Sequence, residues 1–311
     1  MIFYPLNTEY VMIRLMKQLA LIGPTASGKT ALSLQLAQKL NAVILSLDSL
    51  AIYKRIDIAS AKPTLPERGK IVHYGIDEIS VGENFDVTTY IDLYRKVFSE
   101  AASAGKNLII VGGTSFYLKM LLKGISDLPS ISVKSKTHTT RALKDLSQSY
   151  AMLSSLDPEY MQQIASHDRY RIEKVLDLYH ETGMIPSDYF AAHPPKPVIR
   201  GNLPLYQIII KRDFLRERIT QRSNKMIEDG LIDEVCMLEK CYGRAPNCMK
   251  AIGIRETLDF LDGIYTKKEL SEKISTHTAR LAKRQNTFNR SQFTKTFEGS
   301  GEEIYRQILS V

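Results

Sequence analysis

The chain has 311 residues, of which 44% are hydrophobic, enough to bury an α/β core and a second unit. Its formal net charge is +8, which favours a polyanionic partner, although charge alone does not separate nucleic acid binding from a solubilising surface. No apolar run approaches the roughly 20 residues of a membrane span, so no membrane partner is expected.

The termini and cysteines add to this picture. Residues 1 to about 14 are expected to be a loose tail, without the pattern of a signal peptide. Cys236, Cys241 and Cys248 have neither metal nor disulfide spacing, which is typical of reduced thiols. The sequence therefore predicts a cytoplasmic protein.

The first expected element is a buried strand over residues 18–22, followed by a glycine-rich loop and a helix over 30–40. The loop is Gly23-Pro24-Thr25-Ala26-Ser27-Gly28-Lys29-Thr30 and satisfies G-x-x-x-x-G-K-[ST], the P-loop pattern that binds a diphosphate group. Its glycines let backbone N–H groups and a helix N-terminus approach phosphate oxygens. Lys29 is expected to reach the terminal phosphates and Thr30 to hold Mg²⁺. The pattern leaves open which diphosphate binds.

Two further strands are expected over residues 42–47 and 107–111, the second after a helix over about 87–104. The first ends at Asp48-Ser49 and the second at Gly112-Gly113-Thr114. Because ligands of open parallel sheets sit at the carboxyl ends of the strands, the P-loop, Asp48 and Thr114 are expected to converge on one crevice.

Two roles are open for each of these polar residues. Asp48 either orders Mg²⁺ through water or acts as a general base that faces the substrate. The Thr114 hydroxyl bonds the substrate or leaving group, or caps a helix expected over residues 116–123, and these roles are compatible.

From about residue 127 the strand signals vanish, and short helical stretches appear, such as 157–164 and 168–180. A proline-rich segment closes this region, which predicts a helical insertion over residues 127–201. The core is expected in two parts, residues 1–126 and 202–311. The predicted fold class is α/β, with a P-loop NTPase-like parallel sheet and a mostly helical insertion domain.

The second part of the core opens with a strand over residues 205–210. Asp213 is then expected to cap a helix that ends with Gly230 at the position after its C-cap. That helix carries Arg216, Arg218 and Arg222, of which the last two share a face. One arginine is able to clamp phosphate, but a solvated basic face is the alternative for each of them.

A long helix is expected from the capping box Thr266–Glu269 toward Phe288. It carries a stripe of basic residues, and no acidic residue occurs between positions 275 and 290. The cations of this stretch are Arg280, Lys283, Arg284 and Arg290. A solvated helix usually mixes charge signs, so this pattern favours contact with a phosphate backbone.

Motifs in a consistent order extend from about Leu19 to Arg290. They are Gly23–Thr30, Asp48-Ser49 with Tyr53, Ala61-Lys62-Pro63, Gly112-Gly113-Thr114, Asp157-Pro158, Asp168 with Arg171, Thr182-Gly183, Arg222 with Met226, Gly230–Val235, Ala251-Ile252-Gly253 with Glu256, and Ala282-Lys283-Arg284-Gln285 with Thr287. Together they resemble the tRNA dimethylallyltransferases, which prenylate the adenine just 3′ of the anticodon.

The resemblance implies a prenyltransferase in which the P-loop and Mg²⁺ bind the diphosphate of dimethylallyl diphosphate. A monomer is expected, although the sequence itself does not reveal the oligomeric state. Asp48 is then the base for the adenine amine, and Thr114 and Arg222 are partners of the substrate and the diphosphate. Contacts with the tRNA anticodon stem-loop are implied by the resemblance, or by charge on the C-terminal helix. The residues expected in them are Asp48, Ser49, Leu50, Ala51, Lys136, Tyr170, Arg171, Ile172, Glu173, Lys174, Lys250, Gly253, Arg255, Arg280, Lys283 and Arg284.

The chain departs from the family pattern at Ala51, Ile254 and Phe288, where glutamine, tyrosine and tryptophan are common. The first two departures remove groups able to contact tRNA, so a divergent, catalytically weakened tRNA-binding paralogue is one alternative. A small-molecule kinase that binds ATP in the same loop is another. The kinase explains the P-loop and Asp48, but not Gly112-Gly113-Thr114 or the acid-free basic helix.

Overall fold

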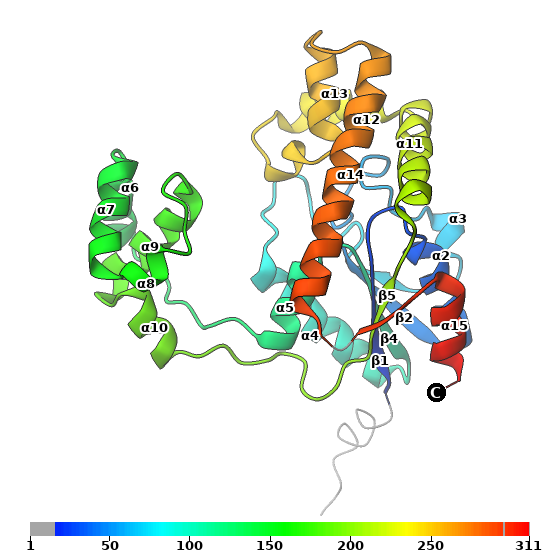
Figure 1. Cartoon of the computed structure of the whole chain (residues 1–311), viewed down its shortest axis with the longest axis horizontal. Coiled ribbons are helices and arrows are strands. Elements are labelled where there is room, and N and C mark those ends of the chain that lie inside the picture. The colour runs from blue at the N-terminus through cyan, green and yellow to red at the C-terminus, as the bar shows by residue number, and fades with distance from the viewer. Residues whose placement is uncertain (1–15, 295, 311) are drawn as a thin grey trace, which may run out of the picture. The chain divides into compact units, whose positions relative to one another are not determined.

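A computed structural model of the chain describes residues 16–294 and 296–310. The chain divides into two compact units (Figure 1). The first unit contains the described residues up to Lys119 and from Gly201 onward, and the second unit contains Met120–Arg200. The tail expected over residues 1 to about 14 lies outside the described residues.

The first unit is built on one parallel sheet with strand order β3-β2-β4-β1-β5-β6. Its strands are β1 (Gln18–Ile22), β2 (Ala42–Leu47), β3 (His73–Tyr74), β4 (Asn107–Gly112), β5 (Leu205–Ile208) and β6 (Thr296–Gly299). Every residue of β2 is buried, as expected for a strand covered on both faces. The predicted fold class is confirmed.

Helices cover the sheet on both sides (Figure 1). On one face, α2 (Lys29–Lys39) and α15 (Gly301–Leu309) pack their leucines and isoleucines against Ile44 and Ile109. Helix α4 (Val87–Ser103) packs on β2 and β4, and α5 (Ser115–Lys123) follows β4. The β6 strand carries a weak local signal, since it is a short and mostly polar edge strand, whereas α15 opens with a capping box at Ser300–Glu303.

A helical layer adjoins the carboxyl ends of the strands. It consists of α3 (Leu65–Arg68), α11 (Arg212–Glu228), α12 (Leu231–Tyr242), a 3₁₀ turn (Asn247–Lys250), α13 (Ile254–Leu261) and α14 (Lys267–Gln292). Its apolar core joins Ile52 and Ile56, from the loop after β2, to α12, α13 and α14. This packing fixes the loop that follows Asp48.

The helix ends confirm two predictions and correct one. Gly230 has φ +104° directly after the C-cap of α11, and the Thr266–Glu269 capping box opens α14. Asp213 does not cap α11, because that helix begins at Arg212 with Lys211 as its N-cap. The Asp213 carboxylate instead lies in the first turn, where it complements the helix dipole.

The second unit is helical. Its helices are α6 (Val133–Ala142), α7 (Leu146–Leu156), α8 (Pro158–Met161), α9 (Arg169–Thr182) and α10 (Pro186–Ala192). Its core gathers Leu153, Met161, Ile172 and Leu176. In either unit, no helix within residues 16–294 and 296–310 is both long and apolar enough to cross a membrane.

Candidate active site

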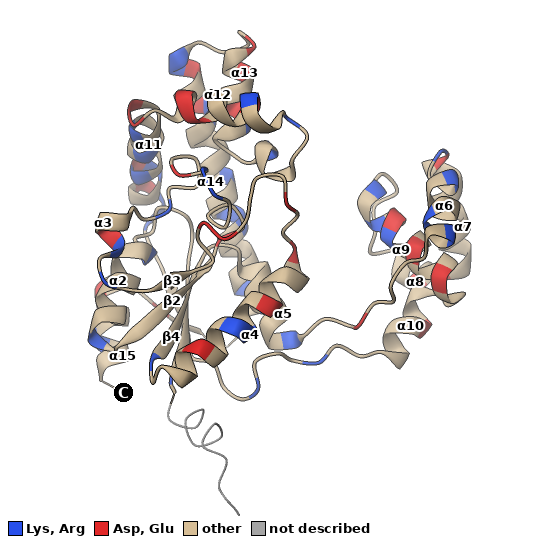
Figure 2. Cartoon of the chain, turned by 180° about the vertical axis from the view of Figure 1, so that it is seen from behind, with Lys and Arg blue, Asp and Glu red and all other residues tan. Residues whose placement is uncertain are grey.

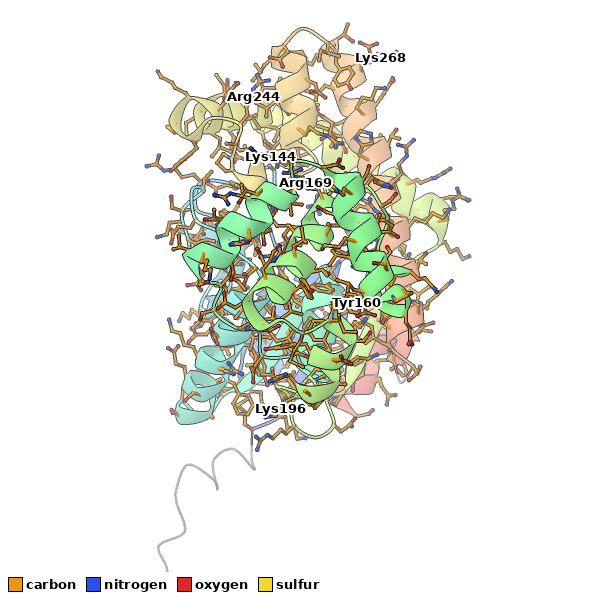
Figure 3. The ribbon with its side chains drawn as sticks, turned by 90° about the vertical axis from the view of Figure 1, so that its left-hand side faces the viewer. Lys144, Tyr160, Arg169, Lys196, Arg244 and Lys268 are labelled. Carbon is orange, nitrogen blue, oxygen red and sulfur yellow. The ribbon has the colours of Figure 1, made fainter. Side chains whose placement is uncertain are left out.

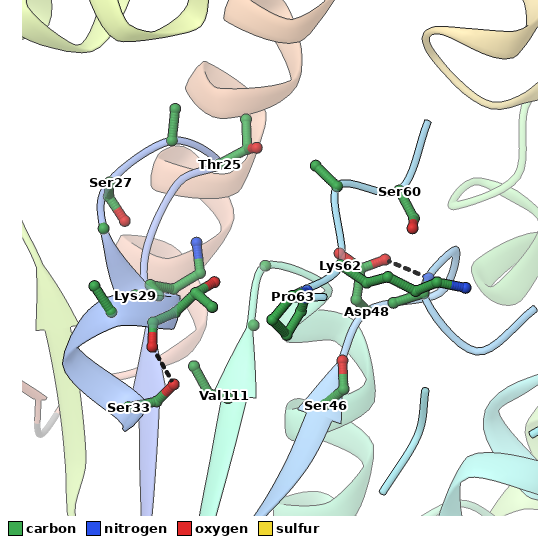
Figure 4. A pocket seen from close by; sticks show the side chains of 18 of the residues that line it. Thr25, Ser27, Lys29, Ser33, Ser46, Asp48, Ser60, Lys62, Pro63 and Val111 are labelled. Atoms are coloured by element: carbon green, nitrogen blue, oxygen red, sulfur yellow. Dashed lines mark hydrogen bonds between the residues drawn. The ribbon is translucent and has the colours of Figure 1, made fainter. Parts of the chain in front are cut away.

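A cavity of about 570 Å³ opens at the carboxyl ends of the strands (Figure 4). It is lined by Thr25–Thr30 of the P-loop, Asp48, the Ser60–Pro63 loop, Gly112 and Gly113, Arg218 and Arg222 of α11, and Gln285 of α14. The predicted convergence of the P-loop and Asp48 on one crevice is thus observed. Thr114 is not among the residues that line the cavity.

The P-loop backbone forms a concave anion cradle. Ala26 has φ +63° and Gly28 has φ +94°, and Gly28 precedes α2 without a side-chain cap, so the first N–H groups of that helix remain open to a ligand. The buried Ser27 hydroxyl has no hydrogen-bond partner within the described residues. These donors fit the oxygens of a diphosphate.

Lys29 is held against its own loop. Its Nζ donates to the carbonyl oxygens of Gly23 (2.9 Å) and Pro24 (2.6 Å). Burial lowers the pKa of Lys29 to about 7, with a further decrease from Arg222 and an opposing increase from Asp48. An anion in the cavity would favour the charged ammonium, because it adds the counter-charge that this buried group lacks.

Asp48 is fixed at the end of β2. Its Oδ1 accepts from the backbone N–H groups of Leu50 (2.8 Å) and Ala51 (3.2 Å). The Thr114 hydroxyl accepts from the Ser49 N–H at 3.3 Å, which joins the ends of β2 and β4. Among the described residues that hydroxyl makes no bond to α5, so the side-chain cap considered for Thr114 is not formed.

Steric crowding explains why glycines occupy positions 112 and 113 at the end of β4. A Cβ on Gly112 would lie 2.2 Å from the Leu47 carbonyl oxygen, and a Cβ on Gly113 would lie 2.3 Å from Gln285 Nε2. Gln285 Oε1 accepts from the Thr25 N–H (2.9 Å), and its Nε2 donates to the Gly113 carbonyl (3.1 Å). The pair therefore admits close contacts with β2 and with α14.

The three arginines singled out in the sequence of α11, Arg216, Arg218 and Arg222, separate in the structure. Arg218 and Arg222 line the cavity, whereas Arg216 lines a groove between α11 and α14. Burial lowers the pKa of Arg222, and the Asp48 carboxylate partly opposes this effect. No hydrogen bond or ion pair among the described residues engages the Arg222 guanidinium, which leaves it available to an anion.

A second loop forms the opposite wall of the cavity. The buried Lys62 ammonium pairs with Asp57 (2.6 Å), donates to the Tyr53 carbonyl (3.1 Å) and also pairs with Asp77. The Glu234 carboxylate accepts from three consecutive backbone N–H groups, those of residues 57, 58 and 59, at 2.7–2.9 Å. Lys62 and Glu234 belong to the segments that resemble the family, but no site role was predicted for them.

The side chains at the cavity bear on whether this site fits Mg²⁺. No cluster of three or more His, Cys, Asp or Glu able to hold a metal occurs in the part of the chain that the structure describes. Mg²⁺ is commonly bound through few protein oxygens together with substrate phosphates and water. The Thr30 hydroxyl at the cavity fits that pattern.

The predicted RNA contacts of the first unit are of two kinds. Lys250 and Arg255 are exposed, while Gly253 begins α13 and donates its N–H to the buried Glu256 (2.7 Å). Ile254, one of the departures from the family pattern, is fully buried and packs in the core. Ala51 is buried as well, but it lines the cavity.

The second unit holds the predicted contacts Lys136 and Tyr170–Lys174. Tyr170 is 69% exposed, and the Lys174 ammonium lies 5.7 Å from its ring centroid. Ile172 belongs to the predicted tRNA-contacting segment, but its side chain is fully buried in the core, so only its backbone is available for such a contact. The Lys136 ammonium is paired with Glu173 (2.7 Å) and Asp177 (2.8 Å).

The same unit presents cations that were not predicted. Lys144 and Arg169 lie near one another on the face shown in Figure 3. Arg169 Nη1 donates to the Leu143 carbonyl at 3.0 Å.

A groove of about 720 Å³ runs between α11 and α14. Its lining contains five cations and no carboxylate: Arg212, Arg216, Arg280, Lys283 and Arg290. Figure 2 shows basic residues along α11. Arg280 and Lys283 were predicted as RNA contacts from the sequence, and Arg290 belongs to the same basic stretch, whereas Arg212 and Arg216 were not predicted to contact RNA.

The fold and the cavity define a P-loop protein in which the phosphate loop faces a strand-end aspartate across one pocket. Among such proteins, the chain belongs to the IPP transferase family, which matches residues 51–292. The predicted resemblance is confirmed.

The relatives extend this match over nearly the whole chain. The tRNA dimethylallyltransferase of Sulfurovum sp. is 61% identical over 94% of this chain and 97% of the relative. That of Sulfurimonas denitrificans is 52% identical over 95% and 99%.

Solved structures agree. The tRNA isopentenylpyrophosphate transferase of Bacillus halodurans superposes with a TM-score of 0.69 at 29% identity, covering 94% of this chain and 96% of that one. A eukaryotic dimethylallyltransferase solved acting on tRNA gives a TM-score of 0.77 at 27% identity, covering 88% and 70%.

Proposed function

We propose that this protein transfers a dimethylallyl group from dimethylallyl diphosphate to N6 of the adenine 3′-adjacent to the anticodon in tRNA, releasing diphosphate. One observation carries the proposal: the P-loop and Asp48 face one cavity that also receives Arg218 and Arg222. The names of the relatives support the substrate pair.

The reaction requires a good leaving group, because an adenine amino group is a weak nucleophile. The bond between the allylic carbon and the diphosphate oxygen breaks as the carbon–N6 bond forms, and negative charge accumulates on the diphosphate. Lys29, Arg222 and the P-loop amides lie where they stabilise that charge. Mg²⁺, when held by Thr30 and the phosphates, would neutralise further charge.

Asp48 completes the transfer. N6 becomes cationic as it is alkylated, so its proton becomes acidic enough for an ordinary carboxylate to remove. The Leu50 and Ala51 N–H groups hold one oxygen of Asp48 in place, and the other oxygen receives the proton. We assign Asp48 as the base, and place Thr114 behind it as a residue that fixes the Asp48-Ser49 turn through its bond to the Ser49 N–H.

The acceptor must enter the cavity as an unstacked base. Proteins that read RNA sequence target loop bases that are splayed out of the stack, and chemistry on a base requires its extrusion. We propose that exposed residues of both units contact the anticodon stem-loop. In the first unit these are Lys250, Arg255, Arg280, Lys283 and Arg284, and in the second unit Tyr170, Arg171 and Lys174.

The test is a reaction of the protein with an anticodon stem-loop RNA and dimethylallyl diphosphate, followed by mass spectrometry of the nucleosides. Prenylated adenosine and free diphosphate are expected. A parallel reaction with ATP and a panel of metabolites tests the kinase alternative, and phosphoryl transfer without prenylated adenosine would overturn the proposal. RNA binding without prenyl transfer would instead support the weakened paralogue.

A further inference from the structure

Helix α14 contacts the P-loop in two independent ways. The Gln285 amide joins the P-loop to the turn after β4, through Thr25 N–H (2.9 Å) and the Gly113 carbonyl (3.1 Å). In addition, Ala26 at the tip of the P-loop packs on the small apolar cluster between α11 and α14 that contains Ala282. The two contacts attach adjacent P-loop residues to one helix.

The contact at Gln285 suits an amide side chain. An amide offers both an acceptor and a donor, and Gln285 uses one of each. A carboxylate would set a second acceptor against the Gly113 carbonyl, and an apolar side chain would satisfy neither backbone group. The three atoms nearest to a Cβ at Gly113 would all belong to the Gln285 amide, the nearest at 2.3 Å.

The P-loop benefits from such a restraint. Ala26 has φ +63°, a conformation that costs free energy for any residue except glycine and persists when its surroundings enforce it. Thr25, directly before it, receives the Gln285 bond. The loop geometry that presents Ser27, Gly28 and Lys29 to an anion therefore depends on a contact made by α14.

We propose that Gln285 is a positioning residue for the diphosphate site. It fixes the P-loop against the Gly113 turn and thereby preorganises the amides and Lys29 for the leaving group. The inference rests on the proposed function for its reaction, but the anion site that it describes is testable with inorganic pyrophosphate alone.

The first experiment replaces Gln285 with methionine, which keeps the length of the side chain and removes both hydrogen bonds. We expect pyrophosphate affinity and kcat/KM for dimethylallyl diphosphate to fall about tenfold, as for the loss of one or two hydrogen bonds. The dissociation constant for the RNA and the melting temperature should match those of Gln292→Met. Gln292 lies on the same helix, and its amide bonds only to Ser291 (3.0 Å). Unchanged pyrophosphate binding would overturn the proposal.

A double-mutant cycle guards against a purely structural effect. Gly113→Ala in the wild-type background should weaken pyrophosphate binding by a similar factor, because the new methyl group displaces the Gln285 amide. In the Gln285→Ala background the same substitution should have little effect, since the three atoms nearest to that methyl group all belong to the Gln285 amide. If the effects of the two substitutions on pyrophosphate binding are additive, the proposed positioning role of Gln285 is contradicted.

The two proposals fail in different ways. If wild-type protein forms no prenylated adenosine but pyrophosphate binding still depends on Gln285, the proposed reaction is wrong and the positioning role of Gln285 is supported. If prenyl transfer occurs and both substitutions leave the kinetics of the donor unchanged, the positioning role of Gln285 is wrong and the proposed reaction is supported.

Discussion

The cations on the P-loop side of the cavity in the first unit differ in their partners from Lys136, a predicted RNA contact of the second unit. In the cavity, Arg218 and Arg222 make no ion pair with any described residue, and Lys29 binds carbonyl oxygens instead of a carboxylate. In the second unit, the Lys136 ammonium is paired with Glu173 and with the buried Asp177 of helix α9.

The difference distinguishes two uses of a basic residue. An unpaired, desolvated cation is costly until an anion arrives, and the lowered pKa of Lys29 and of Arg222 records that cost. A cation already bound by carboxylates contributes to local structure and has less to offer a phosphate. The expected effects of substitution should therefore differ in kind between the two regions.

The largest effect is expected at Asp48. Asp48→Asn keeps an oxygen to accept from Leu50 and Ala51 but removes the base, so the single-turnover rate of prenyl transfer should fall about 10²- to 10⁴-fold. The dissociation constant for RNA should stay the same. Asp213→Asn, in the exposed first turn of α11, serves as the control. A rate within a few-fold of wild type would exclude Asp48 as the base.

The next effect concerns Arg222 and the charge of Lys29. Because the pKa of Lys29 is lowered to about 7, the free ammonium is lost as pH rises through that value, and pyrophosphate affinity should decrease from about pH 7 upward. Arg222→Gln should weaken binding about tenfold to a hundredfold. It should also move the pH midpoint upward, because Arg222 is one of the groups that lowers the pKa of Lys29.

Titration calorimetry with pyrophosphate at several pH values measures both changes. Arg218→Gln is the matched control, since Arg218 also lines the cavity but does not contribute to the lowered pKa. The ionisation of pyrophosphate itself is common to all variants and cancels in the comparison. A midpoint that stays fixed in Arg222→Gln would contradict the assignment.

A smaller effect is expected in the groove between α11 and α14. The double variant Arg216→Gln/Arg290→Gln removes two of its five cations and should raise KM for tRNA several-fold while leaving the donor kinetics intact. The slope of log affinity against log salt should fall by roughly one to two. Lys267→Gln/Lys268→Gln removes the same charge beside Glu228 and Glu272 and should change the slope less. Equal slopes for the two double variants would argue against RNA in this groove.

The smallest effect on RNA is expected at Lys136. Lys136→Met leaves the buried Asp177 carboxylate without its ammonium partner, so the second unit should lose about 1–3 kcal/mol of stability. RNA affinity should change less than twofold, as measured on folded protein below the melting transition. A large loss of RNA affinity with unchanged stability would support Lys136 as an RNA contact. It would also contradict the difference argued between the cavity and the second unit.

Local patterns predicted the elements that carry the reaction. The P-loop, the buried strands β1, β2 and β4, the strand-end Asp48 and the α14 capping box are all encoded within short windows. The start of α11 was predicted too late, after Asp213 instead of at Arg212, because an acidic residue in the first turn resembles a cap in sequence. Ile172 was counted as an RNA contact because it lies in a segment that resembles a tRNA-contacting stretch of the family, although its side chain faces the core.

The sequence by itself determined the chemistry of the anion site, since phosphate binding needs a fixed order of glycines, lysine and threonine within eight residues. Only the tertiary structure decided which cations remain available to a ligand, and which residues hold the loop in place. Thr25 and Gln285 are 260 residues apart, and Lys136 meets Asp177 across two helices. Such pairings depend on how the elements pack, and that packing is determined by residues throughout the chain instead of by a short local pattern.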